Sequence, residues 1–196
     1  MADFENRVKT PPPTTETPAA GGRRSDIPRT VDESIAVSRA EARPETVRPN
    51  PHSTASIGGH PIHPMLIPFP IAFFVGTFVC DLVFWGTGNA SWFDATLWLL
   101  GAGVIMALLA AVAGLTDVLG DEQVRTLSTA WVHAGGNVLV VVLEIVNFFV
   151  RYGQGSAAVL PTGIILSAIV VCILLFTGWK GWEMVYRHRV GVSNAP

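Results

Sequence analysis

Five polar side chains share one face of a single predicted membrane helix, and their types make them the first candidates for chemistry. Their spacings are four, seven, three and four residues: His133, Asn137, Glu144, Asn147 and Arg151. At about 100° per residue, all five fall within about 40° of one line along a helix. Polar groups are costly in hydrocarbon unless they face protein or water. This polar face is therefore expected to contact other helices.

Three more histidines are expected on the membrane side where His133 lies. His60 and His63 directly precede the first apolar segment, and His188 follows the last one. Neutral imidazoles at fixed positions bind haem iron and metal ions, so these four histidines are candidate ligands for haem b or a divalent metal. His63 with His133 is the preferred pair, and His133 with His188 is the second. Supporting polar residues are expected beside them: Asp117, Asn137 and Glu183.

The alternative interpretation of the histidines is that they only cap helices and form hydrogen bonds. No HExxH or similarly dense ligand spacing is present. A metallohydrolase that uses His60, His63 and Asp117 is a further alternative. The sequence contains no nucleophile–base motif and no glycine-rich phosphate loop, so no catalytic residue is assigned.

A second polar cluster is expected near the opposite side of the membrane. Asp81 and Glu144 lie at similar depths in their segments, and Asn147 and Arg151 share the face of Glu144. One interpretation is an acid–arginine network that fixes helix register. The other is a proton or cation site. Val140 interrupts the polar face between Asn137 and Glu144, which predicts two separate pockets rather than one pore.

Four apolar segments are long enough to position these side chains across a bilayer. They cover about residues 66–85, 95–119, 130–150 and 161–182. The connectors between them are short and polar, so neighbouring helices are expected to run antiparallel. The predicted fold is an all-α, antiparallel four-helix transmembrane bundle. Small residues on one face of the second segment predict close helix packing: Gly103, Ala107, Ala110 and Gly114.

The distribution of positive charge predicts the orientation of this bundle. All Lys and Arg residues except Arg151 are expected on the side that holds both termini. The positive-inside rule places that side in the cytoplasm. The sequence therefore predicts a multi-pass protein of a bacterial inner membrane with both termini cytoplasmic.

The N-terminal part of the chain has a different composition. Residues 1–57 hold eight of the 14 prolines, eight of the 13 Lys and Arg residues and eight of the 15 Asp and Glu residues. A disordered cytoplasmic tail is expected there, with a short helix near 32–42 that Pro44 would end. Its charges balance, so no nucleic-acid partner is expected. The transmembrane domain is predicted over 58–192, followed by a short end at 193–196.

Several motifs in combination resemble a known family. They are GHPIHPMLIPFPIA, AVAGLTDVLG, GWKGWEMVYRHRVGV, and His133 followed by Asn147 and Arg151. This pattern resembles the bacterial membrane-protein family catalogued as domain of unknown function 2231, over about residues 58–192. The resemblance implies a small four-span inner-membrane protein without a settled activity. The positions typical of the family are His60, His63, Asp117, His133, Arg151, Glu183 and His188.

Some relatives resemble fusions to Rieske-type iron–sulfur domains, which implies redox chemistry for the family. This chain has no Rieske cysteine–histidine motif, so a redox partner would be a separate protein. Three functions therefore fit the sequence. They are electron transfer through haem b or a metal, a structural or assembly scaffold in the membrane, and proton or cation transport. The lipid bilayer is an expected partner in each, and homo-oligomerisation is compatible with all three.

Overall fold

The structure is a computed structural model, and it describes residues 30–41 and 49–193. The chain divides into two units, residues 1–47 and 48–196. In the first unit, α1 (Val31–Glu41) is the short helix that the sequence predicts. The Thr30 hydroxyl accepts a hydrogen bond from the Glu33 backbone N–H at its start. Pro44 and most of the predicted tail lie outside the described residues.

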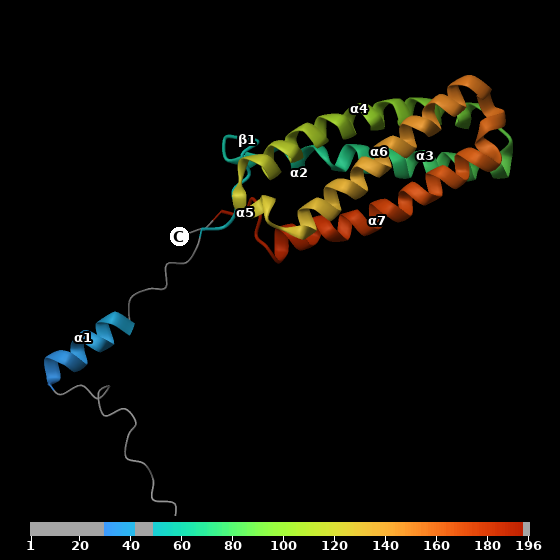
Figure 1. Cartoon of the computed structure of the whole chain (residues 1–196). Helices are drawn as coiled ribbons and strands as arrows, with labels where there is room; N and C mark the ends of the chain where they lie inside the picture. Colours follow the sequence, from blue (N-terminus) through green and yellow to red (C-terminus); the bar gives the residue numbers. More distant parts are fainter. Residues whose placement is uncertain (1–29, 42–48, 194–196) are drawn as a thin grey trace, which may run out of the picture. The chain divides into compact units, whose positions relative to one another are not determined.

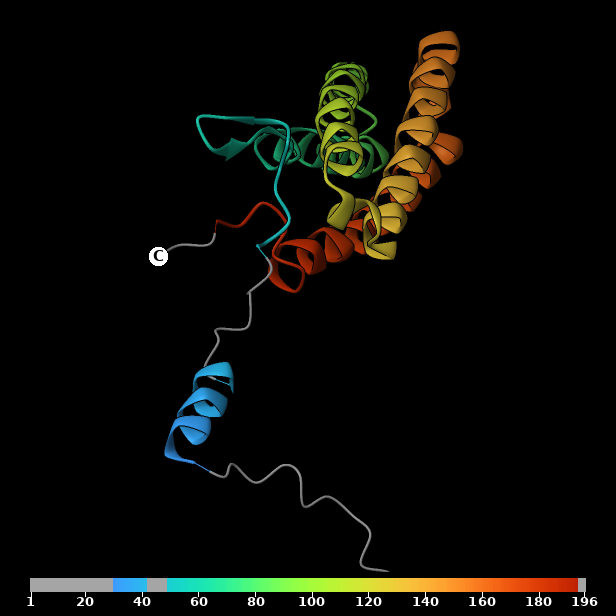
Figure 2. The ribbon, with the colours of Figure 1, turned by 60° about the vertical axis from the view of Figure 1, so that its left-hand side comes forward.

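The second unit is mostly helical (Figure 1). A two-stranded antiparallel hairpin, with strands β1 and β2, precedes a short helix, α2. The long helices α3, α4, α6 and α7 then lie side by side, as the second view also shows (Figure 2). The elements are β1 (Ser56–Ile57), β2 (His60–Pro61), α2 (Ile62–Leu66), α3 (Pro68–Thr87), α4 (Ala90–Gly120), α5 (Glu122–Arg125), α6 (Ser128–Gln154), η1 (Gly155–Ala158), η2 (Val159–Gly163) and α7 (Ile164–Tyr186).

Local capping explains why the first turn between long helices is shorter than predicted. Gly88 adopts a φ of 64° and ends α3, a left-handed conformation that glycine adopts without steric cost. The Asn89 side chain then accepts a hydrogen bond from the Ser91 N–H at 3.0 Å and starts α4. As a result, α4 begins at Ala90, five residues before the predicted start of the segment.

Three helical stretches are long and apolar enough to cross a membrane, judged by length and composition. They are Ile62–Thr87, Ala90–Gly120 and Ser128–Tyr186. The third contains both α6 and α7, which are separated by a kink where Leu160 has non-helical dihedral angles. The sequence predicts four spans here. Whether α6 and α7 each cross the membrane, in an antiparallel bundle, stays a prediction.

The core between the long helices is a thin apolar layer to which α3, α4, α6 and α7 each contribute one buried side chain. These side chains are Phe74, Leu100, Val140 and Val170. A Cβ on Gly103 would lie 2.5 Å from the Phe74 ring, so glycine lets α4 approach α3 closely at this level. The predicted small-residue face of α4 therefore contacts α3 at Gly103.

Residues before the hairpin contact the folded unit, although the sequence assigns them to the tail. The Asp117 carboxylate accepts hydrogen bonds from the Ser53 hydroxyl at 2.9 Å and the Ala55 N–H at 2.7 Å. Asp121 accepts one from the His52 N–H at 2.7 Å. Carboxylates bind backbone N–H groups strongly, which explains why this segment follows the end of α4.

A histidine pair and a buried arginine network

His63 of α2 and His133 of α6 lie next to each other. Their ring centres are 6.1 Å apart, and the ring planes are inclined by 85°. The His63 Nδ1 lies 2.7 Å from the carbonyl oxygen of Ala110 on α4. The His133 Nδ1 lies 2.8 Å from the carbonyl oxygen of Thr177 on α7. Two separate helix pairs, α2 with α4 and α6 with α7, therefore hold one imidazole each.

These contacts determine which ring nitrogen can bind a ligand. A carbonyl oxygen only accepts hydrogen bonds, so Nδ1 carries the hydrogen in both rings and donates it. In the neutral ring the lone pair is then on Nε2. Within the described part of the chain, no hydrogen bond reaches the Nε2 atom of His63 or His133. Metal-binding histidines have this arrangement, because an Nδ1–H bond to a carbonyl orients the ring.

Glycines give the two rings their space. A Cβ on Gly114 would lie 2.8 Å from the His63 ring, and one on Gly181 would lie 3.3 Å from the His133 ring. Beside them, Asn137 donates to the His133 carbonyl oxygen at 2.8 Å and accepts from the Thr177 hydroxyl at 3.3 Å. Asn137 therefore lies next to the pair, as the sequence predicts, and links α6 to α7.

The other predicted members of the histidine cluster are elsewhere. His60 is exposed in β2, and His188 lies in a turn after α7, where it lines an open pocket with Pro49 and Gln123. Asp117 contacts the segment before β1, as described above. Glu183 forms ion pairs with Lys180 at 3.0 Å and Arg187 at 2.9 Å. The expected four-histidine cluster is therefore not assembled around Asp117 and Glu183.

This separation also limits the metal chemistry available. Among the described residues, no group of three or more His, Cys, Asp and Glu side chains could hold a metal ion. A structural zinc site needs four protein ligands and a catalytic one needs three. The structure brings only two imidazoles together.

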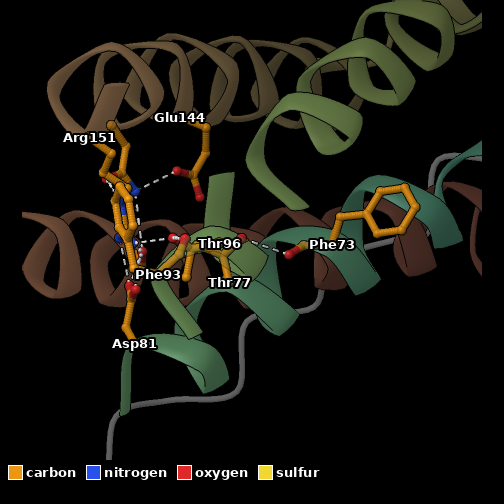
Figure 3. A network of polar contacts seen from close by, with 9 residues as sticks. Phe73, Thr77, Asp81, Phe93, Thr96, Glu144 and Arg151 are labelled. Carbon is orange, nitrogen blue, oxygen red and sulfur yellow. Dashed lines mark hydrogen bonds and ion pairs between the residues drawn. The ribbon is translucent and has the colours of Figure 1, made fainter. Parts of the chain in front are cut away.

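A second polar site is centred on Arg151 (Figure 3). The Arg151 side chain is 0% exposed. Its guanidinium forms a bidentate ion pair with Asp81 of α3. Nη1 lies 2.6 Å from Oδ1, and Nη2 lies 2.7 Å from Oδ2. This parallel geometry is the strongest form of arginine–carboxylate contact. The sequence-predicted residues Asp81 and Arg151 are therefore in direct contact.

The remaining N–H groups of Arg151 are also used. Nε donates to the Asn147 side-chain oxygen at 2.8 Å, Nη1 to the Thr96 hydroxyl at 3.0 Å, and Nη2 to the Ser167 hydroxyl at 3.2 Å. All five N–H donors of the guanidinium thus have acceptors. The partners come from α3, α4, α6 and α7, so this network, which we call the arginine network, joins all the long helices.

Sequence reasoning missed two members of the arginine network, Thr96 and Ser167. Both are hydroxyl residues in mostly apolar segments that also contain other threonines, so the sequence offers no signal that singles them out. It also missed Gly163, where a Cβ would lie 2.7 Å from Arg151 Nη2 and 3.0 Å from the Ala158 carbonyl oxygen. Glycine at position 163 therefore makes room for the guanidinium.

Glu144, which the sequence places in this cluster, is buried with one carboxyl oxygen lacking a hydrogen-bond partner among the described residues. Its side chain is 0% exposed, and Oε2 accepts a hydrogen bond from the Asn147 amide at 2.9 Å. Its other oxygen, Oε1, is buried without a hydrogen-bond partner. Buried polar atoms without partners are rare and costly.

Residues 59–194 match the profile of a family described as predicted membrane proteins, DUF2231. The chain belongs to the DUF2231 family. The resemblance that the motifs predict is confirmed, and the protein is a membrane protein. A search of curated proteins found no match, and a search of solved structures found none.

The DUF2231 region contains both polar sites and explains the surface of the helices. Large apolar side chains are exposed along the outside, including Trp98 on α4 and Leu175 on α7. In a membrane protein such side chains face lipid. Inside, the apolar layer around Val140 lies between Asn137 and Glu144 on the same helix face, so it separates the histidine pair from the arginine network.

Proposed function

We propose that this DUF2231 protein is a multi-pass protein of a bacterial inner membrane that crosses it with α3, α4, α6 and α7. The two-residue break between α3 and α4 and the kink at Leu160 support tight reversals at one end. The Lys and Arg distribution supports cytoplasmic termini. In this arrangement the histidine pair lies toward the cytoplasmic side and the arginine network toward the outer side.

We further propose that His63 and His133 would hold haem b through their Nε2 atoms. The observation that carries this proposal is their juxtaposition with both Nδ1 atoms fixed by backbone carbonyls. A neutral imidazole with its lone pair on Nε2 is the histidine form that binds haem iron.

The number of ligands favours haem over a divalent metal. The porphyrin supplies four nitrogens to the iron, so the protein needs to provide only two. A zinc ion would need a third and usually a fourth protein ligand, and the described residues offer none beside this pair. The chemistry that a two-histidine haem supplies is one-electron transfer, and we propose a separate membrane redox protein as the partner.

The test is the absorption spectrum of the full-length protein, purified after expression with ample haem. We expect a Soret band, a low-spin spectrum that changes on reduction, and about one haem per chain by extraction. Elemental analysis of the same sample measures other metals. A sample without a Soret band contradicts the haem proposal, and a stoichiometric divalent metal in it would favour the divalent-metal alternative.

A scaffold is the second candidate function, and the arginine network favours it. All five guanidinium N–H groups have acceptors on the surrounding helices, as expected for a group that fixes helix register. If the protein is only a scaffold, His133→Ala will lower its abundance in the membrane and remove no cofactor. Quantitative immunoblotting together with haem extraction distinguishes the two functions.

A further inference from the structure

The arginine network leaves one atom unsatisfied, the Oε1 atom of Glu144. The Glu144 side chain is fully buried, and its carboxyl group points into the interior between the helices (Figure 3). An ionised carboxylate accepts several hydrogen bonds, but Glu144 receives one, from Asn147. This environment suits a neutral carboxylic acid better than a carboxylate.

The donors around Glu144 are already committed. The five N–H groups of Arg151 go to Asp81, Asn147, Thr96 and Ser167. The two amide hydrogens of Asn147 go to Glu144 Oε2 and to Ser167.

The hydroxyl hydrogens are committed as well. Ser167 donates to Asp81, and Thr96 and Thr77 donate to the backbone carbonyls of Phe93 and Phe73. Among the described neighbours of the network, no donor is therefore left for Oε1.

The charges lead to the same conclusion. The charged groups that interact with Glu144 are Arg151 on its own helix and Asp81 on α3. The packed faces of α4 and α7 contribute Thr96 and Ser167, which stay neutral, and the thiol of Cys80 lies beside Asp81. Arg151 and Asp81 neutralise each other, so an ionised Glu144 would leave one unpaired negative charge in the membrane interior. A proton on Oε1 makes the whole network neutral.

A metal cation is a poorer fit than a proton. Calcium takes six to eight oxygen ligands, and magnesium needs an octahedral set. Both oxygens of Asp81 are occupied by Arg151, and one of them also by Ser167. In the described residues, Oε1 of Glu144 is then the buried side-chain oxygen that a cation could use. One free oxygen is far fewer than calcium or magnesium needs.

We propose that Glu144 is a proton-binding site inside the membrane domain, with the proton on Oε1. The proton comes from water and forms an O–H bond with the carboxylate oxygen, and no electron is transferred. This inference does not rest on haem binding, because the apolar layer around Val140 lies between Glu144 and the histidine pair.

The test is infrared spectroscopy of the full-length protein in lipid vesicles at neutral pH. We expect a carbonyl band of a protonated carboxyl group that shifts in D₂O and shifts again when all glutamates carry ¹³C. Glu144→Gln should abolish the band, because Gln keeps the shape and the acceptor for Asn147 but carries no acidic proton. Glu122→Gln, the same change at an exposed position on α5, should leave it intact.

Each outcome bears on the proposal. A wild-type spectrum without the band means that Oε1 is satisfied by water or a cation, and overturns the proposal. A band that persists in Glu144→Gln, or that fails to shift in D₂O, also overturns it. If Glu144→Gln does not fold, the ¹³C-glutamate shift in the wild type decides, because an aspartate band would not move. Loss of haem binding with the band intact would refute only the proposed function.

Discussion

Removing one charge of the Asp81–Arg151 pair should destabilise the protein far more than removing both. Arg151→Met leaves the Asp81 carboxylate buried with one hydrogen bond, from Ser167. Asp81→Leu leaves the guanidinium buried without its counter-ion. Breaking a buried ion pair by removing one partner costs about 3–5 kcal/mol.

A count of hydrogen bonds gives a similar magnitude. Arg151→Met removes five hydrogen bonds, and side-chain hydrogen bonds in membrane proteins contribute about 0.6 kcal/mol each, so the loss is about 3 kcal/mol. The double variant removes both charges and leaves Asn147 and Thr96 each without one hydrogen bond and Ser167 without two. We therefore expect it to cost about 2 kcal/mol, well below the sum of the single variants.

The assay is equilibrium unfolding of the purified protein in detergent micelles with increasing dodecyl sulfate, followed by tryptophan fluorescence. Arg187→Met is the control, because Arg187 is 72% exposed and its pair with Glu183 is worth about 0–1 kcal/mol. A cost below about 1 kcal/mol for either single variant of the buried pair would show that this ion pair does not stabilise the bundle in the way proposed. A double variant that costs as much as both single variants together would show that the two charges are not coupled.

Three other changes have defined outcomes. Gly163→Ala should lower the free energy of unfolding by about 1–3 kcal/mol, because the added Cβ would meet the Arg151 side chain. Gly153→Ala is the control, because nothing lies within 4 Å of a Cβ at that position, and it should leave the free energy of unfolding unchanged. Unfolding in dodecyl sulfate compares the two variants. Gly114→Ala should reduce the haem content of the purified protein several-fold, and an unchanged Soret band would contradict the proposed site.

Burial raises the pKa of Asp121, but hydrogen bonds from three backbone N–H groups outweigh it and hold the folded-state pKa below 3.8. Its stabilising contribution is therefore present above about pH 4 and lost as pH falls through the folded-state pKa. Unfolding measured against pH should show a shallower acid loss for Asp121→Asn than for the wild type, and equal slopes would refute this.

Helix periodicity places Arg151 on the face of Glu144, and Glu144 lies at about the same depth as Asp81. These two features predict that Asp81 and Arg151 belong to one polar cluster. Asp81 and Arg151 are 70 positions apart, yet the structure joins their side chains. The hydroxyl partners could not be predicted in this way. Thr96 and Ser167 belong to no periodic polar pattern in their segments, and their contacts depend on the rotation of each helix about its axis.

The histidines show where prediction from helix ends fails. All helix ends on one side were expected to bring four histidines together, but His60 lies in a hairpin before α2 and His188 in a turn after α7. Outside a helix the direction of the chain is set by local turns and by contacts such as those of Asp117. Only His63 and His133, which lie within helices, meet.

The haem content of three single variants, measured side by side, tests haem binding by His63 and His133 most directly. His63→Ala and His133→Ala should each lose the low-spin Soret spectrum, while His60→Ala, an exposed histidine three positions from His63, should keep it at wild-type stoichiometry. Equal haem content in all three variants, or loss in His60→Ala alone, would contradict haem binding by His63 and His133.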